Sequence, residues 1–223
     1  MATVECSGIL FDLDGTLIDS GTAVQDAWTE FGHSVGRDPA RILEMCPGKR
    51  TTEVIELLNL DMPTRETAER VEGLIIYAGS KPVPGAVEFL KSLPQDCWAV
   101  VTSSMARTAW SRFELTELPE PQAIVSADDV ATGKPDPACY LLGAEELAVE
   151  PAQCLVFEDA VAGIAAGRNA GMQVAALETT EVPSALTNAT FVVPDFRAVR
   201  LAGAVQSATG TWTLSIELAE VQV

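Results

Sequence analysis

Acidic, hydroxyl and cationic side chains gather in four short segments of this chain, each carrying groups that can take part in catalysis. In chain order these groups are Asp12 and Asp14; Thr102 and Ser103; Lys134; and Glu158 and Asp159. Two carboxylates spaced two residues apart and followed by glycine can face the same cleft. The spacing therefore predicts a site built from several carboxylates, hydroxyl donors and a single ammonium group.

Carboxylates brought this close together repel one another, and each raises the pKa of its neighbours. A hard divalent cation relieves that repulsion, and a site with few protein ligands and room for water suits Mg²⁺. Phosphoryl transfer needs positioning and charge neutralisation, which Mg²⁺, Lys134 and the Thr102 and Ser103 hydroxyls can supply. The residue types thus indicate metal-assisted chemistry on a phosphate group.

Short apolar runs precede these groups, and their lack of polar alternation is typical of strands covered on both faces. The expected strands are Gly8–Phe11, Trp98–Thr102, Ala123–Val125, Cys154–Phe157, Gln173–Ala176 and Phe191–Val193. Helical patterns between them cover Gly85–Ser92, Ala106–Glu114, Pro137–Leu147 and Val161–Ala170. This order predicts an α/β fold with a doubly wound parallel sheet, in which ligands bind at the carboxyl ends of the strands.

One stretch between the first two strands shows only helical periodicity. It runs from Ser20 to about Gly79, and the segments at its borders, Thr16–Gly21 and Lys81–Gly85, carry the glycine and proline expected of hinges. We therefore expect an all-helical cap over residues 17–84, inserted into a core of residues 1–16 and 85–223. Near the end of the chain, Thr211–Leu218 alternates apolar and polar residues, which favours an edge strand.

The composition is that of a folded, acidic protein, because 48% of its 223 residues are hydrophobic. A net charge of −18 repels polyanions and argues against partners such as nucleic acid or an anionic membrane. The five cysteines form no CxxC pair, which is typical of reduced thiols. Neither a basic leader nor a long apolar run follows Met1, so we expect a cytoplasmic protein. We also expect it to be a monomer or a weak homodimer.

The four segments resemble the four motifs of the haloacid dehalogenase-like superfamily, in the same order. The resemblance rests on Asp12–Thr16, the hydroxyls after Val101, Gly133–Pro135 and Glu158–Asp159, and it spans about residues 6–200. It is closest to subfamily I, whose helical cap lies between the first two motifs. The resemblance implies a Rossmann-like core and a Mg²⁺ cofactor.

The resemblance also implies a role for each motif residue. Asp12 is the expected nucleophile, and Asp14 the acid and base that protonates the leaving oxygen and later deprotonates water. Lys134 neutralises charge, while Thr102 or Ser103 bonds a phosphoryl oxygen. The expected metal ligands are the Asp12 and Asp159 side chains and the Asp14 carbonyl. Glu158 is expected to support these ligands without contacting the metal, or to be an occasional ligand itself.

Within this superfamily, Asp14 favours phosphatase or phosphomutase chemistry, because dehalogenases of the superfamily have no acid at this position. The cap loop Pro47–Thr52 is the expected substrate contact, through Lys49 and Arg50, although both could instead be solvated charges at the start of a helix. We thus expect a phosphatase acting on a small phosphorylated metabolite, such as a sugar or polyol phosphate. A β-phosphoglucomutase-like phosphomutase and a phospho-aspartate signalling or binding module are the alternatives.

Overall fold

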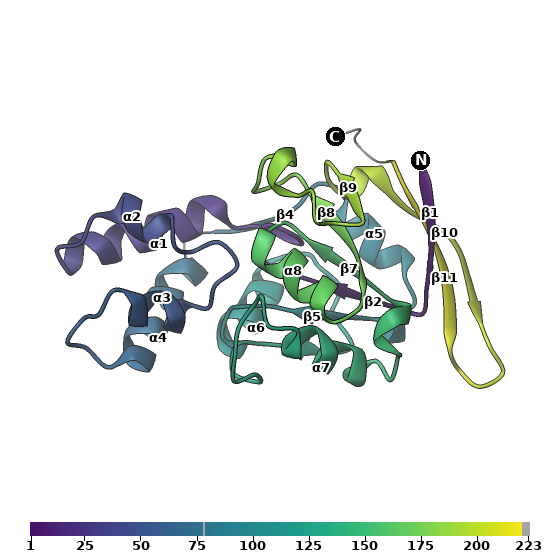
Figure 1. Ribbon diagram of the computed structural model, residues 1–223, viewed down its shortest axis with the longest axis horizontal. Coiled ribbons are helices and arrows are strands. Elements are labelled where there is room, and N and C mark those ends of the chain that lie inside the picture. The colour runs from purple at the N-terminus through teal and green to yellow at the C-terminus, as the bar shows by residue number, and fades with distance from the viewer. Residues whose placement is uncertain (78, 220–223) are drawn as a thin grey trace.

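A computed structural model describes residues 1–77 and 79–219 of the chain. Figure 1 shows three parts in a row: a group of helices at one end, an α/β core in the middle and a small antiparallel sheet at the other end. None of the helices described is long and apolar enough to cross a membrane.

The core is a six-stranded sheet in the order β6-β5-β2-β7-β8-β9, and every neighbouring pair of its strands is parallel. The strands are β2 (Gly8–Phe11), β5 (Trp98–Val101), β6 (Ile124–Val125), β7 (Cys154–Glu158), β8 (Gln173–Leu177) and β9 (Phe191–Val193). All six coincide with the expected strands to within one residue at each end, so the α/β prediction is confirmed. Strand β2 lies between β5 and β7, which places Asp12 at the centre of the carboxyl edge.

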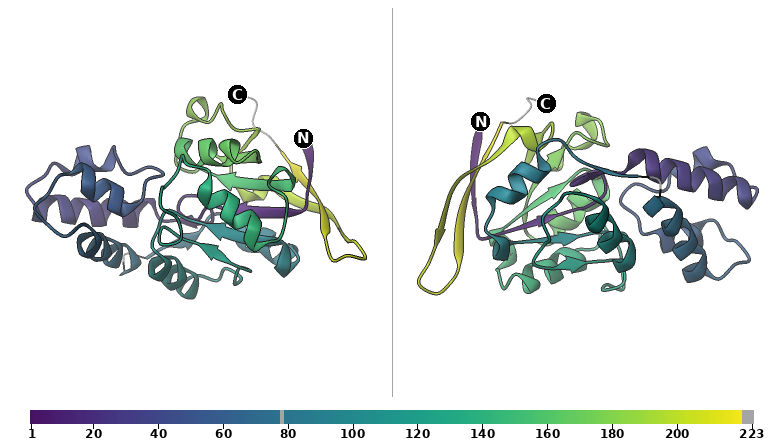
Figure 2. Two further views of the ribbon diagram at one scale, coloured as in Figure 1. Left: turned by 60° about the horizontal axis from the view of Figure 1, so that its bottom comes forward. Right: turned by 180° about the vertical axis from the view of Figure 1, so that it is seen from behind.

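Helices cover both faces of this sheet, as Figure 2 shows from two sides. They are α5 (Ala86–Ser92), α6 (Ala106–Leu115), α7 (Ala138–Glu146) and α8 (Val161–Asn169), within one residue of the expected bounds. The strand residues alternate between two buried clusters. Ile9 and Phe11 pack with α5 and α6, whereas Leu10 packs with α7 and α8. This two-sided burial explains why the strands read as continuous apolar runs.

A second, three-stranded antiparallel sheet packs against the core in the order β1-β11-β10. Its strands are β1 (Ala2–Cys6), β10 (Val199–Gln206) and β11 (Trp212–Leu218). The expectation of an edge strand at Thr211–Leu218 is wrong in one respect, because β11 is the central strand and pairs with both neighbours. Alternation indicated a strand with one buried face, but it carried no information about the partners on either side.

The inserted segment is helical, as expected, with α1 (Gly21–Ser34), α2 (Pro39–Leu43), α3 (Thr51–Leu57) and α4 (Thr64–Tyr77). These helices bury a cluster of their own around Trp28 and Phe31, to which Met105 of the core also contributes. The chain enters and leaves the cap through β3 (Ile18–Asp19) and β4 (Lys81–Pro82), which pair antiparallel. The pair lies in the expected hinge segments, while the division at residues 17 and 84 stays a prediction.

Aromatic rings pack directly beneath the carboxyl edge of the sheet. Phe11 and Phe157, the residues before Asp12 and Glu158, stack with ring centroids 5.2 Å apart. Phe196 lies 5.2 Å from Phe157 and 5.6 Å from Phe89, which closes the cluster from below. Because aromatic pairs prefer defined geometries, the cluster limits how the strand ends can shift against each other.

Replacing Phe196, which is 1% exposed, by alanine leaves a cavity under this cluster. We expect Phe196→Ala to lower the free energy of unfolding by about 3–5 kcal/mol. Leu115→Ala is the control, because Leu115 is 65% exposed and its loss changes the stability by no more than about 0.5 kcal/mol. Urea unfolding of both variants measures the difference, and equal stabilities would contradict this account of the core.

Candidate active site

The Asp12 and Glu158 side chains at the ends of β2 and β7 meet around one buried ammonium group. Lys134 Nζ donates to Asp12 Oδ1 at 2.6 Å, to Glu158 Oε1 at 2.7 Å and to the Val101 carbonyl at 3.1 Å. All three charged side chains are buried. Lysine therefore uses each of its three donors on a different strand end, which fixes β2, β5 and β7 relative to one another.

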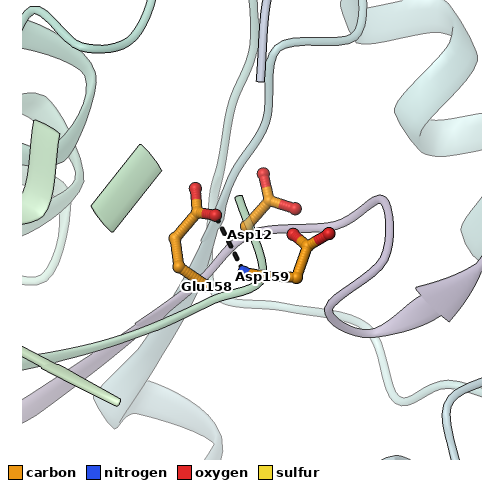
Figure 3. Close-up of side chains that lie close together, drawn as sticks. All are labelled: Asp12, Glu158 and Asp159. Carbon is orange, nitrogen blue, oxygen red and sulfur yellow. Dashed lines mark hydrogen bonds between the residues drawn. The ribbon is translucent and has the colours of Figure 1, made fainter. Parts of the chain in front are cut away.

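Glu158 has little capacity left for a further ligand. Its Oε1 also accepts the Tyr140 hydroxyl at 2.9 Å, and its Oε2 accepts the backbone N–H groups of Asp159 and Ala160 at 2.9 and 3.1 Å. Figure 3 shows the hydrogen bond that ties the Glu158 carboxylate to the backbone N–H of Asp159. The geometry thus suits a supporting role for Glu158 better than direct metal binding.

Asp159 faces Asp12 from the neighbouring strand end, and the loop that follows Asp14 contacts it. Thr16 Oγ1 donates to Asp159 Oδ1 at 3.1 Å. Gly15 lies so close that a Cβ at its position would be 2.1 Å from Asp159 Oδ2, and its φ is +85°. Only glycine adopts this conformation at this distance without strain, which explains the glycine after Asp14.

These three acids carry more negative charge than Lys134 can balance. Burial raises the pKa of Asp12 well above its usual value, and the charges of Glu158 and Asp159 add to this, against Lys134. Burial and the Glu158 charge raise the pKa of Asp159 to about 7. For Lys134, burial lowers the pKa, but the Asp12 and Glu158 charges outweigh it, so its pKa is raised and it stays charged.

The residues present fit a divalent cation. Asp12, Glu158 and Asp159 each offer a carboxylate oxygen, and these oxygens lie within 4.8 Å of one another. A hard cation among them supplies the positive charge that the raised pKa values of Asp12 and Asp159 show to be missing. The acid cluster expected from the sequence is therefore present as a potential metal site.

Asp14 is held apart from this cluster by three donors. Ser20 Oγ and Arg112 Nη1 both donate to Asp14 Oδ1, the serine at 2.6 Å, while Ser104 Oγ donates to Oδ2 at 2.9 Å. Asp14 is only half-buried, in contrast to Asp12. The two aspartates thus sit in different environments, which allows them to have different roles.

The hydroxyl donors after β5 have separate partners. Thr102 is buried, and its Oγ1 accepts the backbone N–H of Ser104 at 3.0 Å. Ser103 Oγ instead donates to the Gly48 carbonyl of the cap loop at 3.1 Å. Both residues line the same cavity as Asp12 and Asp14.

This cavity has a volume of about 340 Å³ and lies between the strand ends and the cap. Its core side holds the acids and hydroxyls described above, and its cap side includes Val24, Gln25, Trp28 and Lys49. Such a volume suits a small, partly polar molecule.

The two expected cap cations differ in position. Lys49 lines the cavity, whereas Arg50 is not among its lining residues. The Arg50 guanidinium bonds the Val130 and Ala131 carbonyls of the core at 3.0 and 3.1 Å. It also pairs with Glu53, which accepts the Gly133 N–H at 3.2 Å. A substrate contact by Arg50 stays a prediction.

Sequence reasoning missed several members of the site, above all Arg112. The helix α6 buries a stripe formed by Thr108, Ala109, Arg112 and Phe113, and an arginine in such a stripe is a signal that could have been noticed. Ser20 lies directly before the helix α1, a position typical of a helix cap. It makes no side-chain cap bond, and donates to Asp14 instead. Tyr140 carried no sequence signal.

The fold and the site together define a class of protein, α/β proteins with a buried acidic cluster at the carboxyl edge of a parallel sheet, beneath an inserted helical cap. The chain belongs to the haloacid dehalogenase-like hydrolases, a family whose model matches residues 6–171. The family resemblance expected from the four segments is thereby confirmed.

Individual relatives support the same assignment. Hexitol phosphatase A of Escherichia coli (strain K12) is 36% identical over 182 residues, which cover 78% of this chain and 84% of that protein. Glycerol-1-phosphate phosphohydrolase 1 of Saccharomyces cerevisiae is 34% identical over 192 residues, covering 80% of this chain and 77% of that protein. The crystal structure of a hydrolase from Pseudomonas syringae matches with a TM-score of 0.73 and 28% identity, over 85% of this chain and 94% of that one.

The raised pKa of Asp159 predicts how pH affects the metal-free protein. The folded chain keeps a proton up to about pH 7 that an unfolded aspartate, with a pKa of 3.8, has already lost. Stability therefore falls as pH rises through this window, and Asp159→Asn removes the penalty. At about pH 8 we therefore expect the metal-free Asp159→Asn variant to have a higher melting temperature than wild type. The difference is about 2–4 °C for each kcal/mol of the penalty that the substitution removes. At about pH 5 the difference in melting temperature is smaller, because Asp159 is then protonated in the folded wild type.

The matched control for this experiment is Asp61→Asn, because Asp61 is exposed and lies outside the site. Added Mg²⁺ at about pH 8 raises the melting temperature of wild type and of the control more than that of Asp159→Asn, since only the first two keep the full set of acids. If the two variants showed the same pH and Mg²⁺ dependence, Asp159 would not be part of a metal site.

Proposed function

We propose that the protein is a Mg²⁺-dependent phosphatase that hydrolyses a sugar or polyol phosphate through an aspartyl-phosphate on Asp12. The observation that carries this is the Asp12 carboxylate at the end of β2, paired with Lys134 at 2.6 Å and lining one cavity with Asp14. The names of the two related phosphatases support the class of substrate.

In the first step an Asp12 oxygen attacks phosphorus, and the bond between phosphorus and the leaving oxygen breaks. Asp14 gives its proton to that oxygen, so the product leaves as an alcohol. Lys134 stays beside Asp12 and balances charge on the phosphoryl group. Thr102 is the hydroxyl we favour for a phosphoryl oxygen, because its Oγ1 is oriented by the Ser104 N–H and can still donate its own hydrogen.

In the second step a water molecule replaces the alcohol in the cavity. Asp14, now a carboxylate, takes a proton from this water. The water oxygen attacks phosphorus, and the bond between phosphorus and the Asp12 oxygen breaks. Inorganic phosphate leaves, and both aspartates return to their starting states. One residue thus serves as acid and then as base, which fits a half-buried carboxylate that exchanges protons with the cavity.

We propose that Asp12, Asp159 and the Asp14 carbonyl hold the Mg²⁺, with Glu158 supporting Lys134 from behind. When bound, Mg²⁺ neutralises charge on the phosphoryl oxygens. The cap residues then exclude water and contact the rest of the substrate. Lys49 is the cation we expect to reach it, and Trp28 and Gln25 supply an apolar face and an amide.

A phosphomutase would use the same acids and differ in what accepts the phosphoryl group. Incubation with a panel of sugar, polyol, nucleotide and glycolate phosphates separates the two, because a phosphatase releases inorganic phosphate and a mutase releases an isomeric ester. Isomerised ester without phosphate release would overturn the phosphatase proposal. A stable phospho-aspartate with no turnover of any ester would instead indicate a signalling module.

The nucleophile is tested by Asp12→Asn, which keeps the size of the side chain and removes its charge. We expect turnover of the best ester in the panel to fall about 10³-fold or more. Asp61→Asn, on the exposed surface of the cap, keeps wild-type turnover. Full Mg²⁺-dependent phosphate release by Asp12→Asn would show that another residue is the nucleophile.

The cap contact is tested by Lys49→Met. If Lys49 binds the substrate equally in the ground state and the transition state, KM rises about three- to ten-fold with kcat unchanged. Lys91→Met is the matched control, since Lys91 is an exposed lysine on α5 outside the cavity. An unchanged KM in Lys49→Met would exclude this lysine from substrate binding.

A further inference from the structure

Arg112 is the one arginine or lysine besides Lys134 that is fully buried among the described residues. It projects from the buried stripe of α6, and its side chain is 2% exposed. Its only ion pair among those residues is with Asp14, through Nη1. A buried guanidinium is thus placed against the proposed acid and base.

The remaining donors of Arg112 argue against a role in stability alone. Its Nε and Nη2 are inaccessible and have no partner among the described residues. Burying unpaired donors is unfavourable, and a buried arginine that served mainly to stabilise the fold would be expected to satisfy them. The substrate has no access to these two atoms, so direct contact with it through them is excluded. Arg112 is among the residues that line the cavity, and its Nη1 is bonded to Asp14 there, so this bond is the contact through which we expect it to act.

The two carboxylate oxygens of Asp14 accept different numbers of hydrogen bonds. Oδ1 accepts from Arg112 and from Ser20, whereas Oδ2 has a single bond, to the Ser104 hydroxyl. Because Oδ1 already accepts two hydrogen bonds, the proton that Asp14 transfers is carried by Oδ2. The Ser104 hydroxyl allows this, since it can accept a hydrogen bond from Oδ2 as well as donate one to it. Burial lowers the pKa of Arg112 to about 10, partly offset by the Asp12 charge, so the guanidinium remains a cation near neutral pH.

We propose that Arg112 is a positioning residue, which anchors Asp14 Oδ1 so that Oδ2 is presented to the leaving oxygen and to water. Ser20 and Ser104 are hydroxyls that can rotate, whereas the guanidinium is a rigid, planar donor fixed by its burial. Without it, Asp14 keeps only the two serine bonds, whose hydroxyls can follow the carboxylate as it turns. This inference rests on the proposed phosphatase function.

The effect of losing Arg112 depends on the leaving group of the ester. An alkyl ester, such as glycerol phosphate or a sugar phosphate, needs a proton on its leaving oxygen. A p-nitrophenyl ester does not, because p-nitrophenolate is a stable anion. A misplaced Asp14 therefore slows transfer from the alkyl ester and leaves transfer from the aryl ester nearly unchanged in the first turnover.

The experiment compares first-turnover rates of leaving-group release for the two esters in the full chain. In Arg112→Met we expect the alkyl rate to fall about 10- to 100-fold, as in a partial loss of general acid catalysis. The rate of the p-nitrophenolate burst stays within about two-fold, because that step needs no acid. Asp14→Asn shows the same pattern, and Arg112→Met adds no further loss in that background.

Arg112→Lys, which keeps a cation, recovers part of the alkyl rate, and Arg107→Met is the control for an exposed arginine on the same helix. Circular dichroism and thermal melting identify any variant that has not folded. Equal losses with both esters in a folded Arg112→Met, or no loss with either, would overturn the inference. A wild type that releases phosphate from neither ester would reject the proposed function, and the inference with it.

Discussion

The site depends on one constraint, which is that a single buried ammonium group must serve several buried acids. Lys134 reaches β2, β5 and β7 at once, through Asp12, Val101 and Glu158. Isolated carboxylates at this depth would be strongly disfavoured, and each bond from Lys134 reduces that cost. The order of the strands follows the same need, because only adjacent parallel strands bring these groups within reach of one side chain.

The cap is bonded to the loop that carries Lys134. Glu53 of α3 accepts the N–H of Gly133, the residue before Lys134, and Arg50 bonds the carbonyls of Val130 and Ala131 in the same core loop. Ser103 reaches the cap loop from the other side of the site, through the Gly48 carbonyl. The cap loop that lines the cavity is therefore bonded on both sides to segments that carry residues of the site.

Two aspartates two residues apart acquire different properties from this arrangement. Asp12 is buried among acids and tied to Lys134, which suits a nucleophile that must not exchange protons freely. Asp14 is half-buried and held by two hydroxyls and Arg112, which suits a group that gives and takes a proton at the cavity. The aromatic rings under the strand ends keep the backbone of Asp12 in place.

The sequence by itself determined the parallel sheet, the helical insertion and the four segments that meet at the site. These depend on local signals: continuous apolar runs for strands buried on both faces, helical periodicity for the cap, and acids directly after strands. Only the tertiary structure decided that β11 is a central strand, that Arg50 turns to the core and that Arg112 meets Asp14. Those facts depend on which segments, remote in sequence, pack together, and neither residue type nor periodicity encodes such contacts.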